Sequence, residues 1–237
     1  MKKKIGNLIT IIAIIVGVVL IAAPIAKNYF IADRMNQNLI KKVSKKDIER
    51  NKKKKVSYDW DKVKSLDTSS VIKLKDSPKG LPVIGAITIP ELGMNLPIYK
   101  GVSDENMSYG ASTMSDEQEM GQGNYSLISH HVFGLANARK LLFSPLDNAK
   151  AGQKIYITDK ANVYQYNITE VFTVSPSQTD VVNPIEGRKV VTLITCTDIN
   201  ASGRLIVRGD LVATYDYKTI PKDARNGFNL EYQTLAV

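Results

Sequence analysis

The sequence predicts a mainly β domain, of the sandwich or closed-barrel type, joined to an apolar N-terminal segment. Two observations carry the β prediction. Short runs rich in Ile, Val and Tyr recur from about residue 76 and are separated by Pro, Gly and Asn, a pattern typical of many short strands joined by turns. The run Val163–Val174 also alternates apolar and polar residues, with the two-residue period of a strand buried on one face.

The first 26 residues predict a membrane anchor. Three lysines, Lys2–Lys4, precede Leu8–Ala26, which is nineteen residues without a charge. About 20 such residues cross a bilayer, and lysines before them favour a cytoplasmic N-terminus. A cleaved signal peptide is the alternative, but its apolar region is usually about 7–15 residues long, and Pro24 makes a poor cleavage site. In either case we expect the bulk of the chain outside the cytoplasm.

The net charge of +9 belongs to the N-terminal part of the chain. Residues 1–55 hold 14 basic and three acidic residues, a net charge of +11, so the remainder has a net charge of −2. Nucleic acid is therefore not an expected partner of the folded domain. We interpret residues 27–78 as a charged, solvated extracytoplasmic spacer and residues 79–237 as the folded domain, whose predicted function is derived below.

The elements of the domain follow in order. Asp76–Gly101 contains short β-runs punctuated by Pro and Gly. One short helix is expected at Leu135–Leu142, ending near Pro145. The other expected strands are Tyr125–Ile128, Lys154–Thr158, Val163–Val174, Val190–Thr195 and Arg204–Thr214.

Cys196 is the only cysteine, which excludes an intrachain disulfide and an all-cysteine metal site. A free cysteine is most often a small buried residue, but this one ends a strand on which Thr192 and Ile194 share its face. Arg204 opens the next strand after a seven-residue loop, which can place its guanidinium beside the thiol. A nearby positive charge lowers the pKa of a thiol, and a guanidinium can stabilise an oxyanion.

A histidine would complete such a site as a general acid and base. The only two histidines, His130 and His131, are adjacent and follow a strand-like run. Adjacent residues in a strand point to opposite faces, so only one of them can face the thiol. Spacing alone does not choose between them.

These residues resemble the sortases, the membrane-anchored cysteine transpeptidases of Gram-positive bacteria. The resemblance rests on "TLITC" ending at Cys196, on Arg204 eight positions later and on "SLISHH" upstream, and it covers about Tyr58 to the C-terminus. It implies an eight-stranded closed β-barrel with one or two short helices. It also implies cleavage of an LPxTG-type sorting signal between Thr and Gly, through a thioacyl intermediate that passes to the amine of a cell-wall precursor.

The resemblance also assigns roles to individual residues. It makes Cys196 the nucleophile, His130 the catalytic histidine, Arg204 the oxyanion-stabilising cation and Thr195 an assisting hydroxyl. The predicted substrate-binding residues are Ile128, Ile194, Val182 and Met114. The single anchor and the polar C-terminus look like class A, the housekeeping class.

Several residues near the site have alternative readings. Arg208 is a rival to Arg204 as the catalytic cation, but we interpret Arg208 as a surface or barrel-rim charge. Asp198 could orient His130 in a triad. Positions that bind calcium in some class A sortases read Ser115, Gln118 and Gln122. Since calcium prefers carboxylates, we expect no metal or other cofactor and no calcium activation.

The resemblance implies three partners: LPxTG-bearing surface proteins, the amine of a peptidoglycan precursor and the membrane. Two alternatives stay open from the sequence. One is an extracytoplasmic cysteine peptidase, with water as the acyl acceptor. The other is a membrane-tethered binding module in which Cys196 is merely buried.

Overall fold

In the computed structural model, eight strands close into a barrel in the order β1-β2-β3-β4-β7-β8-β6-β5. The structure describes residues 2–59, 81–134 and 136–232. Within these residues, the β2–β3 and β4–β7 pairs are parallel and the other neighbouring pairs are antiparallel. The strands are β1 Val83–Ile89, β2 Met94–Tyr99, β3 Ala111–Thr113, β4 Asn124–Ile128, β5 Lys154–Thr158, β6 Asn162–Val174, β7 Val190–Cys196 and β8 Arg204–Asp216. The mainly β prediction and the eight-stranded barrel are confirmed.

Helices occupy the N-terminus, the connections and the C-terminal end. The α-helices are α1 Lys2–Gln37, α2 Lys45–Lys52, α4 Asp104–Tyr109 and α5 Lys222–Asn229. The short 3₁₀ helices are η1 Ile40–Lys42, η3 Pro90–Leu92, η4 Ala136–Lys140, η5 Ser144–Asn148, η6 Thr179–Val182 and η7 Tyr217–Thr219. The helix expected at Leu135–Leu142 is the 3₁₀ turn η4, shorter than predicted.

The barrel interior is filled by alternate residues of the strands. Tyr125 and Leu127 of β4 and Leu193 of β7 are at most 2% exposed and belong to the main core. Their neighbours in sequence point to the outer face of the sheet, since side chains alternate along a strand. The sheet formed by β4, β7 and β8 therefore has an inner face that fills the barrel and an outer face that carries the candidate site.

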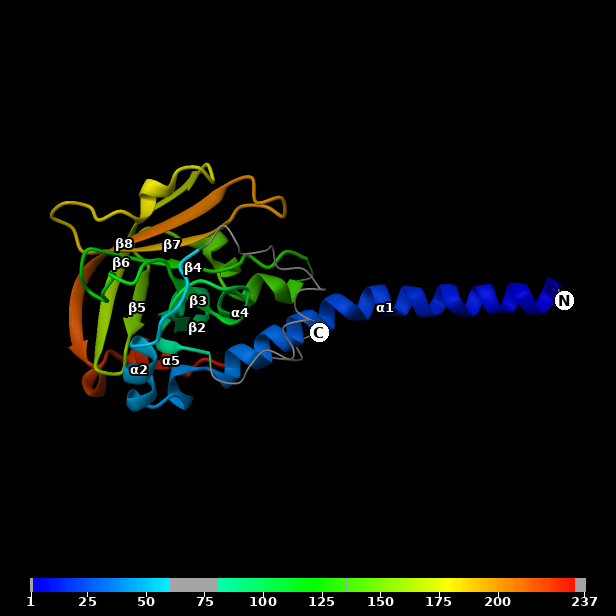
Figure 1. The fold of residues 1–237 in the computed structure, drawn as a ribbon, viewed down its shortest axis with the longest axis horizontal. Helices are drawn as coiled ribbons and strands as arrows, with labels where there is room; N and C mark the ends of the chain where they lie inside the picture. Colours follow the sequence, from blue (N-terminus) through cyan, green and yellow to red (C-terminus); the bar gives the residue numbers. More distant parts are fainter. Residues whose placement is uncertain (1, 60–80, 135, 233–237) are drawn as a thin grey trace.

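The helix α1 projects far beyond the barrel at its N-terminal end (Figure 1). It is long and apolar enough to cross a membrane, and its apolar window is not covered by protein. Its last turns are different, because Ile31 and Met35 are fully buried against the barrel. Asn36 exchanges two hydrogen bonds with the backbone of Tyr232, each of 2.8 Å. One continuous helix thus serves as both apolar span and part of the core.

The segment after α1 also packs on the barrel. Ile40 and Ile48 are fully buried in a cluster with Tyr156 and Phe228, and Asn51 donates to the carbonyl of Val83 at 2.9 Å. The structure differs here from the expected solvated spacer. The few apolar residues of this charged segment are spaced so that they all meet the barrel. Residues 60–78 of that expected spacer lie outside the described residues.

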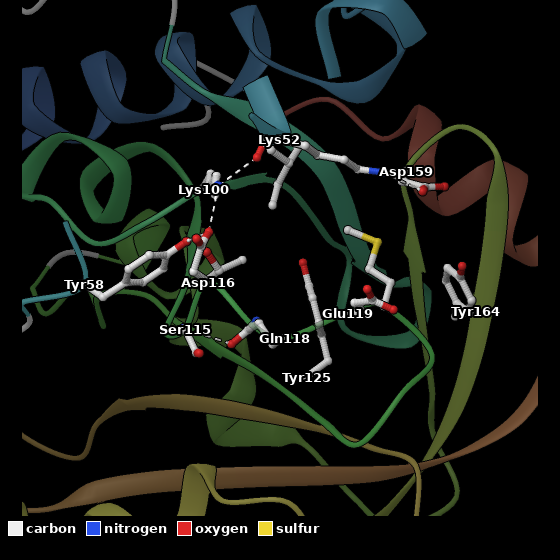
Figure 2. Close-up of a pocket in the computed structure, with 13 residues that line it drawn as sticks. Lys52, Tyr58, Lys100, Ser115, Asp116, Gln118, Glu119, Tyr125, Asp159 and Tyr164 are labelled. Carbon is white, nitrogen blue, oxygen red and sulfur yellow. Dashed lines mark hydrogen bonds and ion pairs between the residues drawn. The ribbon is translucent and has the colours of Figure 1, made fainter. Parts of the chain in front are cut away.

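A polar cavity of about 490 Å³ lies where this N-terminal segment crosses the barrel (Figure 2). Lys100 donates to the carbonyl of Lys52 at 2.7 Å and forms an ion pair with Asp116. Tyr58 donates to the same carboxylate at 3.0 Å, and Lys52 pairs with Asp159 at 2.9 Å. These contacts tie α2 and the chain after it to the β3–β4 and β5–β6 connections.

Candidate active site

Two of the residues predicted to be catalytic end adjacent strands, and the third follows the end of a neighbouring one. Cys196 ends β7 and is paired across the antiparallel ladder with Arg204, the first residue of β8. On its other side, β7 runs parallel to β4 with Ile128 opposite Ile194. The amide of Ser129 continues this register by donating to the carbonyl of Ile194 at 3.2 Å. His130 follows Ser129 directly, two residues beyond the end of β4.

The loop between β7 and β8 holds the guanidinium of Arg204. Its Nη1 donates to the carbonyls of Ala201 and Gly203, at 2.8 and 3.1 Å. Within the described part of the chain, the other two nitrogens have no hydrogen-bond partner. The loop therefore fixes the position of the guanidinium and leaves donors free beside the thiol.

Burial shifts the pKa values of Cys196 and His130 in opposite directions. Desolvation raises the pKa of the Cys196 thiol, an effect opposed by the positive charge of Arg204 and reinforced by Asp198. Desolvation also lowers the pKa of His130 to about 4, and the negative charge of Asp104 partly opposes this. Both shifts favour the uncharged form of the side chain.

His131 takes part in the packing of the loop instead. Its Nε2 lies 2.8 Å from a carboxylate oxygen of Asp147, and its ring stacks on Phe133 with centroids 4.1 Å apart. A bridge to Leu142 fixes its backbone. His130 lies two residues beyond Ile128, so it follows the alternation that puts Ile128 on the outer face of β4.

An apolar cluster lies on the outer face of β4, β7 and β8, the face of β7 that Cys196 shares with Ile194. It contains Ile128 and Ile194, and Met114 and Val182 pack against it from two loops. Met114 and Val182 also line a groove of about 460 Å³ between the β3–β4 and β6–β7 connections. The structure thus brings the four predicted substrate-binding residues together. The other members of this apolar cluster are Val102, Met107, Phe172, Val174, Val181 and Ile206.

Arg208 is not a surface or rim charge, and that interpretation was wrong. It is 9% exposed and lies opposite Thr192, to which its Nε donates at 3.3 Å. Its two terminal nitrogens donate to Glu170 and to the carbonyl of Val181, each at 3.2 Å. A guanidinium whose three nitrogens are all bonded can be buried, and here it ties the groove wall to the barrel.

Asn124 holds the same wall, although no local sequence pattern singles it out. Its amide nitrogen donates to the carbonyls of Val181 and Asn183, at 3.0 and 2.9 Å. The side chain is 7% exposed, so these bonds are shielded from water. The carbonyl of Val181 therefore receives both Asn124 and Arg208, and the loop that carries Val182 is fixed before any ligand arrives.

Thr195 and Asp198 have other partners than the ones expected. The Thr195 hydroxyl is buried and donates to the carbonyl of Ser129 at 2.9 Å. Thr195 and Cys196 are neighbours on a strand, so their side chains point to opposite faces. The assisting role implied by the resemblance stays a prediction. The hydrogen bonds of Asp198 in the described structure go to its own loop, to Thr197, Asn200 and Ser202, so Asp198 does not orient His130.

Gln118, one of the positions that bind calcium in some class A sortases, hydrogen-bonds to its own part of the chain. Gln118 accepts the amides of Met114 and Ser115, at 3.3 and 3.2 Å, and donates to the carbonyl of Ser126 at 2.9 Å. Among the described residues, no group of three or more His, Cys, Asp or Glu is placed to hold a metal ion. Gln118 organises the β3–β4 connection through hydrogen bonds.

The sortase domain model matches residues 87–212. The chain is 45% identical over 229 residues to sortase A of Streptococcus agalactiae, covering 96% of this chain and 93% of that one. It is 33% identical over 207 residues to sortase A of Listeria monocytogenes, covering 87% and 91%.

A solved structure of Listeria monocytogenes sortase A superposes with a TM-score of 0.55 at 34% identity, covering 62% of this chain and 96% of that one. The family match, the two relatives and the fold point to the same chemistry as the Cys–Arg pair at the strand ends. The chain belongs to the sortase family, as a class A cysteine transpeptidase that anchors surface proteins.

Proposed function

We propose that His130, Cys196 and Arg204 carry out the transpeptidation, and that the substrate is an LPxTG-type sorting signal. The observation that carries this proposal is the pairing of Cys196 with Arg204 across β7 and β8, with the segment that leads into His130 hydrogen-bonded along the other side of β7. The sortase A relatives support the substrate class.

The first half-reaction forms a thioester. The Cys196 sulfur attacks the carbonyl carbon of the Thr residue in the signal, and its proton passes to His130. The free donors of Arg204 stabilise the oxyanion. The bond between Thr and Gly then breaks, and His130 returns the proton to the departing amine of Gly.

The second half-reaction transfers the acyl group. The amine of a cell-wall precursor attacks the thioester carbonyl and loses a proton to His130. The carbon–sulfur bond breaks, and the proton returns to the sulfur of Cys196. The result is a new amide and an unchanged enzyme.

The groove supplies the apolar contacts that hold the signal in register. Ile128, Ile194, Met114 and Val182 form a continuous apolar lining beside the thiol. The Leu-Pro part of the signal suits this surface, since burying apolar side chains there removes them from water.

The anchor is a single span with a cytoplasmic N-terminus and an extracellular barrel. Lys2–Lys4 precede the apolar run and favour this orientation. The barrel then faces the cell wall, where the surface proteins and the precursor amine meet.

The test is mass spectrometry of the full chain in detergent, incubated with an LPETG peptide with and without triglycine. The expected result is a peptide-acyl adduct on Cys196 that disappears when triglycine is added, with formation of the triglycine-linked product. Cys196→Ala is the matched control and forms neither species. An adduct released only to water would favour the peptidase alternative. A thiol that gives no adduct and resists alkylation would favour the binding module.

We also predict that the enzyme needs no calcium. The groove wall is held by Asn124 and Arg208 through side-chain bonds to its backbone, so a cation has no ordering left to supply. Transfer measured in EDTA is expected to stay within about two-fold of transfer with millimolar calcium. A larger stimulation by calcium, absent with magnesium, would contradict this prediction.

A further inference from the structure

A cleft of about 800 Å³ lies where α1 leaves its apolar span and meets the barrel. It is lined by Asn28 and Tyr29 of α1, by η3 and the turn after it, by η4, and by the last described residues of the chain. This cleft is separate from the groove and from the polar cavity of Figure 2.

The distance of this cleft from the hydrocarbon core of a bilayer follows from its position along α1. The uncharged run ends at Ala26, and a helix rises about 1.5 Å per residue. Asn28 therefore lies about 3 Å beyond the hydrocarbon, within a headgroup layer that is several ångströms thick. Because α1 is continuous to Gln37, no flexible joint separates the span from the cleft.

The barrel cannot tilt freely away from this level. Ile31 and Met35 are fully buried against it, and Asn28 donates to the side-chain oxygen of Asn137 in η4 at 2.9 Å. Figure 1 shows the last turns of α1 lying along the barrel while the rest projects away. The surface around η4 is thus held facing the membrane.

That surface carries cations with no acidic partner. Arg139 and Lys140 line the cleft, are exposed, and have no hydrogen-bond or ion-pair partner in the described structure. The carboxylates of the cleft are already engaged, since Glu231 pairs with Lys41 at 2.6 Å and Glu91 accepts the amide of Lys154 at 3.3 Å.

A buried polar atom in the cleft is also left without a partner. Asn28 is 3% exposed, and its side-chain oxygen accepts no hydrogen bond. A buried amide oxygen usually has a donor, and the hydroxyls of a lipid headgroup can supply one.

We propose that this cleft binds the headgroup of an anionic phospholipid. Arg139 and Lys140 contact the phosphate, and Asn28 accepts a hydrogen bond from a headgroup hydroxyl. The bound lipid links the membrane surface to η4, which lies in the same β4–β5 connection as His130.

Native mass spectrometry of the full chain tests this proposal. The protein in non-ionic detergent is titrated with phosphatidylglycerol, and the retained lipids are counted for three proteins: the unaltered chain, Arg139→Gln with Lys140→Gln, and Lys218→Gln with Lys222→Gln. The last pair is the matched control, because both lysines are exposed and lie at the far end of β8 and on α5. Each cation near a lipid surface is worth about five-fold in affinity.

The expected result is that the cleft variant binds the first phosphatidylglycerol roughly 5- to 25-fold more weakly, while the control pair matches the unaltered chain. Phosphatidylcholine should bind equally to all three. Binding by the cleft variant within two-fold of the unaltered chain would overturn the proposal. So would an equal loss in the control pair, or an equal loss for phosphatidylcholine. Peptide transfer in detergent is measured on the same samples, which separates this result from failure of the proposed function.

Discussion

At the scale of single residues, Arg204 uses one of its three guanidinium nitrogens to bond its own loop. This nitrogen donates to the carbonyls of Ala201 and Gly203, and among the described residues the other two have no hydrogen-bond partner. The planar fork makes this division possible, because its donors point in fixed and different directions. A lysine ammonium has a single nitrogen that cannot serve the loop and an oxyanion in the same way.

Arg204→Lys should therefore lower kcat by about 100-fold or more, the usual effect of losing one oxyanion donor. The rate of Cys196 alkylation should change far less, since a positive charge remains near the thiol. Steady-state kinetics with an LPxTG peptide gives kcat and KM, and Arg225→Lys serves as an exposed control. Near-normal turnover of Arg204→Lys would remove Arg204 from the mechanism.

At the scale of elements, the groove wall η6 depends on side chains from two strands. Asn124 on β4 and Arg208 on β8 both donate to the carbonyl of Val181. Arg188 adds a further link, since it pairs with Asp210 at 2.8 Å and with Glu170 at 2.9 Å. A wall fixed in advance spares the peptide the entropy of ordering a loop.

Asn124→Ala should raise KM for the peptide by roughly 5- to 20-fold, from the loss of two shielded hydrogen bonds. We expect kcat to stay within about two-fold, because the catalytic strand ends are not touched. Hydrogen exchange should become faster at residues 179–183. Asn167→Ala is the matched control, since its side chain bonds only Gln165 on the same strand. A fall in kcat with unchanged KM would contradict the positioning role.

The junction between α1 and the barrel is the second element-scale feature. Ile31 is fully buried there, whereas Ile14 on the same helix is 60% exposed. Ile31→Ala should lower the free energy of unfolding by about 2–4 kcal/mol, the usual loss for such a core truncation. Urea unfolding of the full chain in detergent measures this loss. Ile14→Ala is expected to be neutral, and an equal effect of both changes would contradict the docking of α1.

At the scale of the whole molecule, burial of the site sets its dependence on pH. The pKa of His130 is lowered to about 4 and that of Cys196 is raised. At any pH between these two pKa values, Cys196 and His130 together hold the same number of protons whether both are neutral or they form a thiolate–imidazolium pair. The fraction of the reactive pair is therefore constant across that window, and the two apparent pKa values belong to the pair.

We accordingly expect kcat/KM to be flat from about pH 6.5, the ordinary pKa of a histidine, up to the pH at which the Cys196 thiol titrates. On the acid side, kcat/KM should fall only below about pH 6.5. The negative charge of Asp104 raises the pKa of His130, so Asp104→Asn should move the acid limb to lower pH. Initial rates from pH 4 to 10 measure both profiles. An acid limb above pH 6.5, or a shift of the opposite sign in Asp104→Asn, would show that burial does not govern His130.

Local patterns were enough to predict most strands of the barrel. The five strands expected from Tyr125 onward agree with β4 to β8 to within two residues at each end, because their alternation and their Gly and Pro boundaries are local signals. The Cys–Arg spacing also placed the pair correctly, since a seven-residue loop between antiparallel strands makes their ends meet. The 3₁₀ turns were not distinguished from a helix, because they share its composition.

The sequence by itself therefore determined the β character, the apolar span and the position of Cys196 and Arg204 at neighbouring strand ends. Only the tertiary structure decided which residues surround them. The charged segment after α1 packs on the barrel because Ile40 and Ile48 reach a common cluster. Arg208 is buried because Glu170 and the carbonyl of Val181, far away in the sequence, satisfy its charge and its donors. Partners of this kind are brought together by barrel closure, and no local pattern reports them.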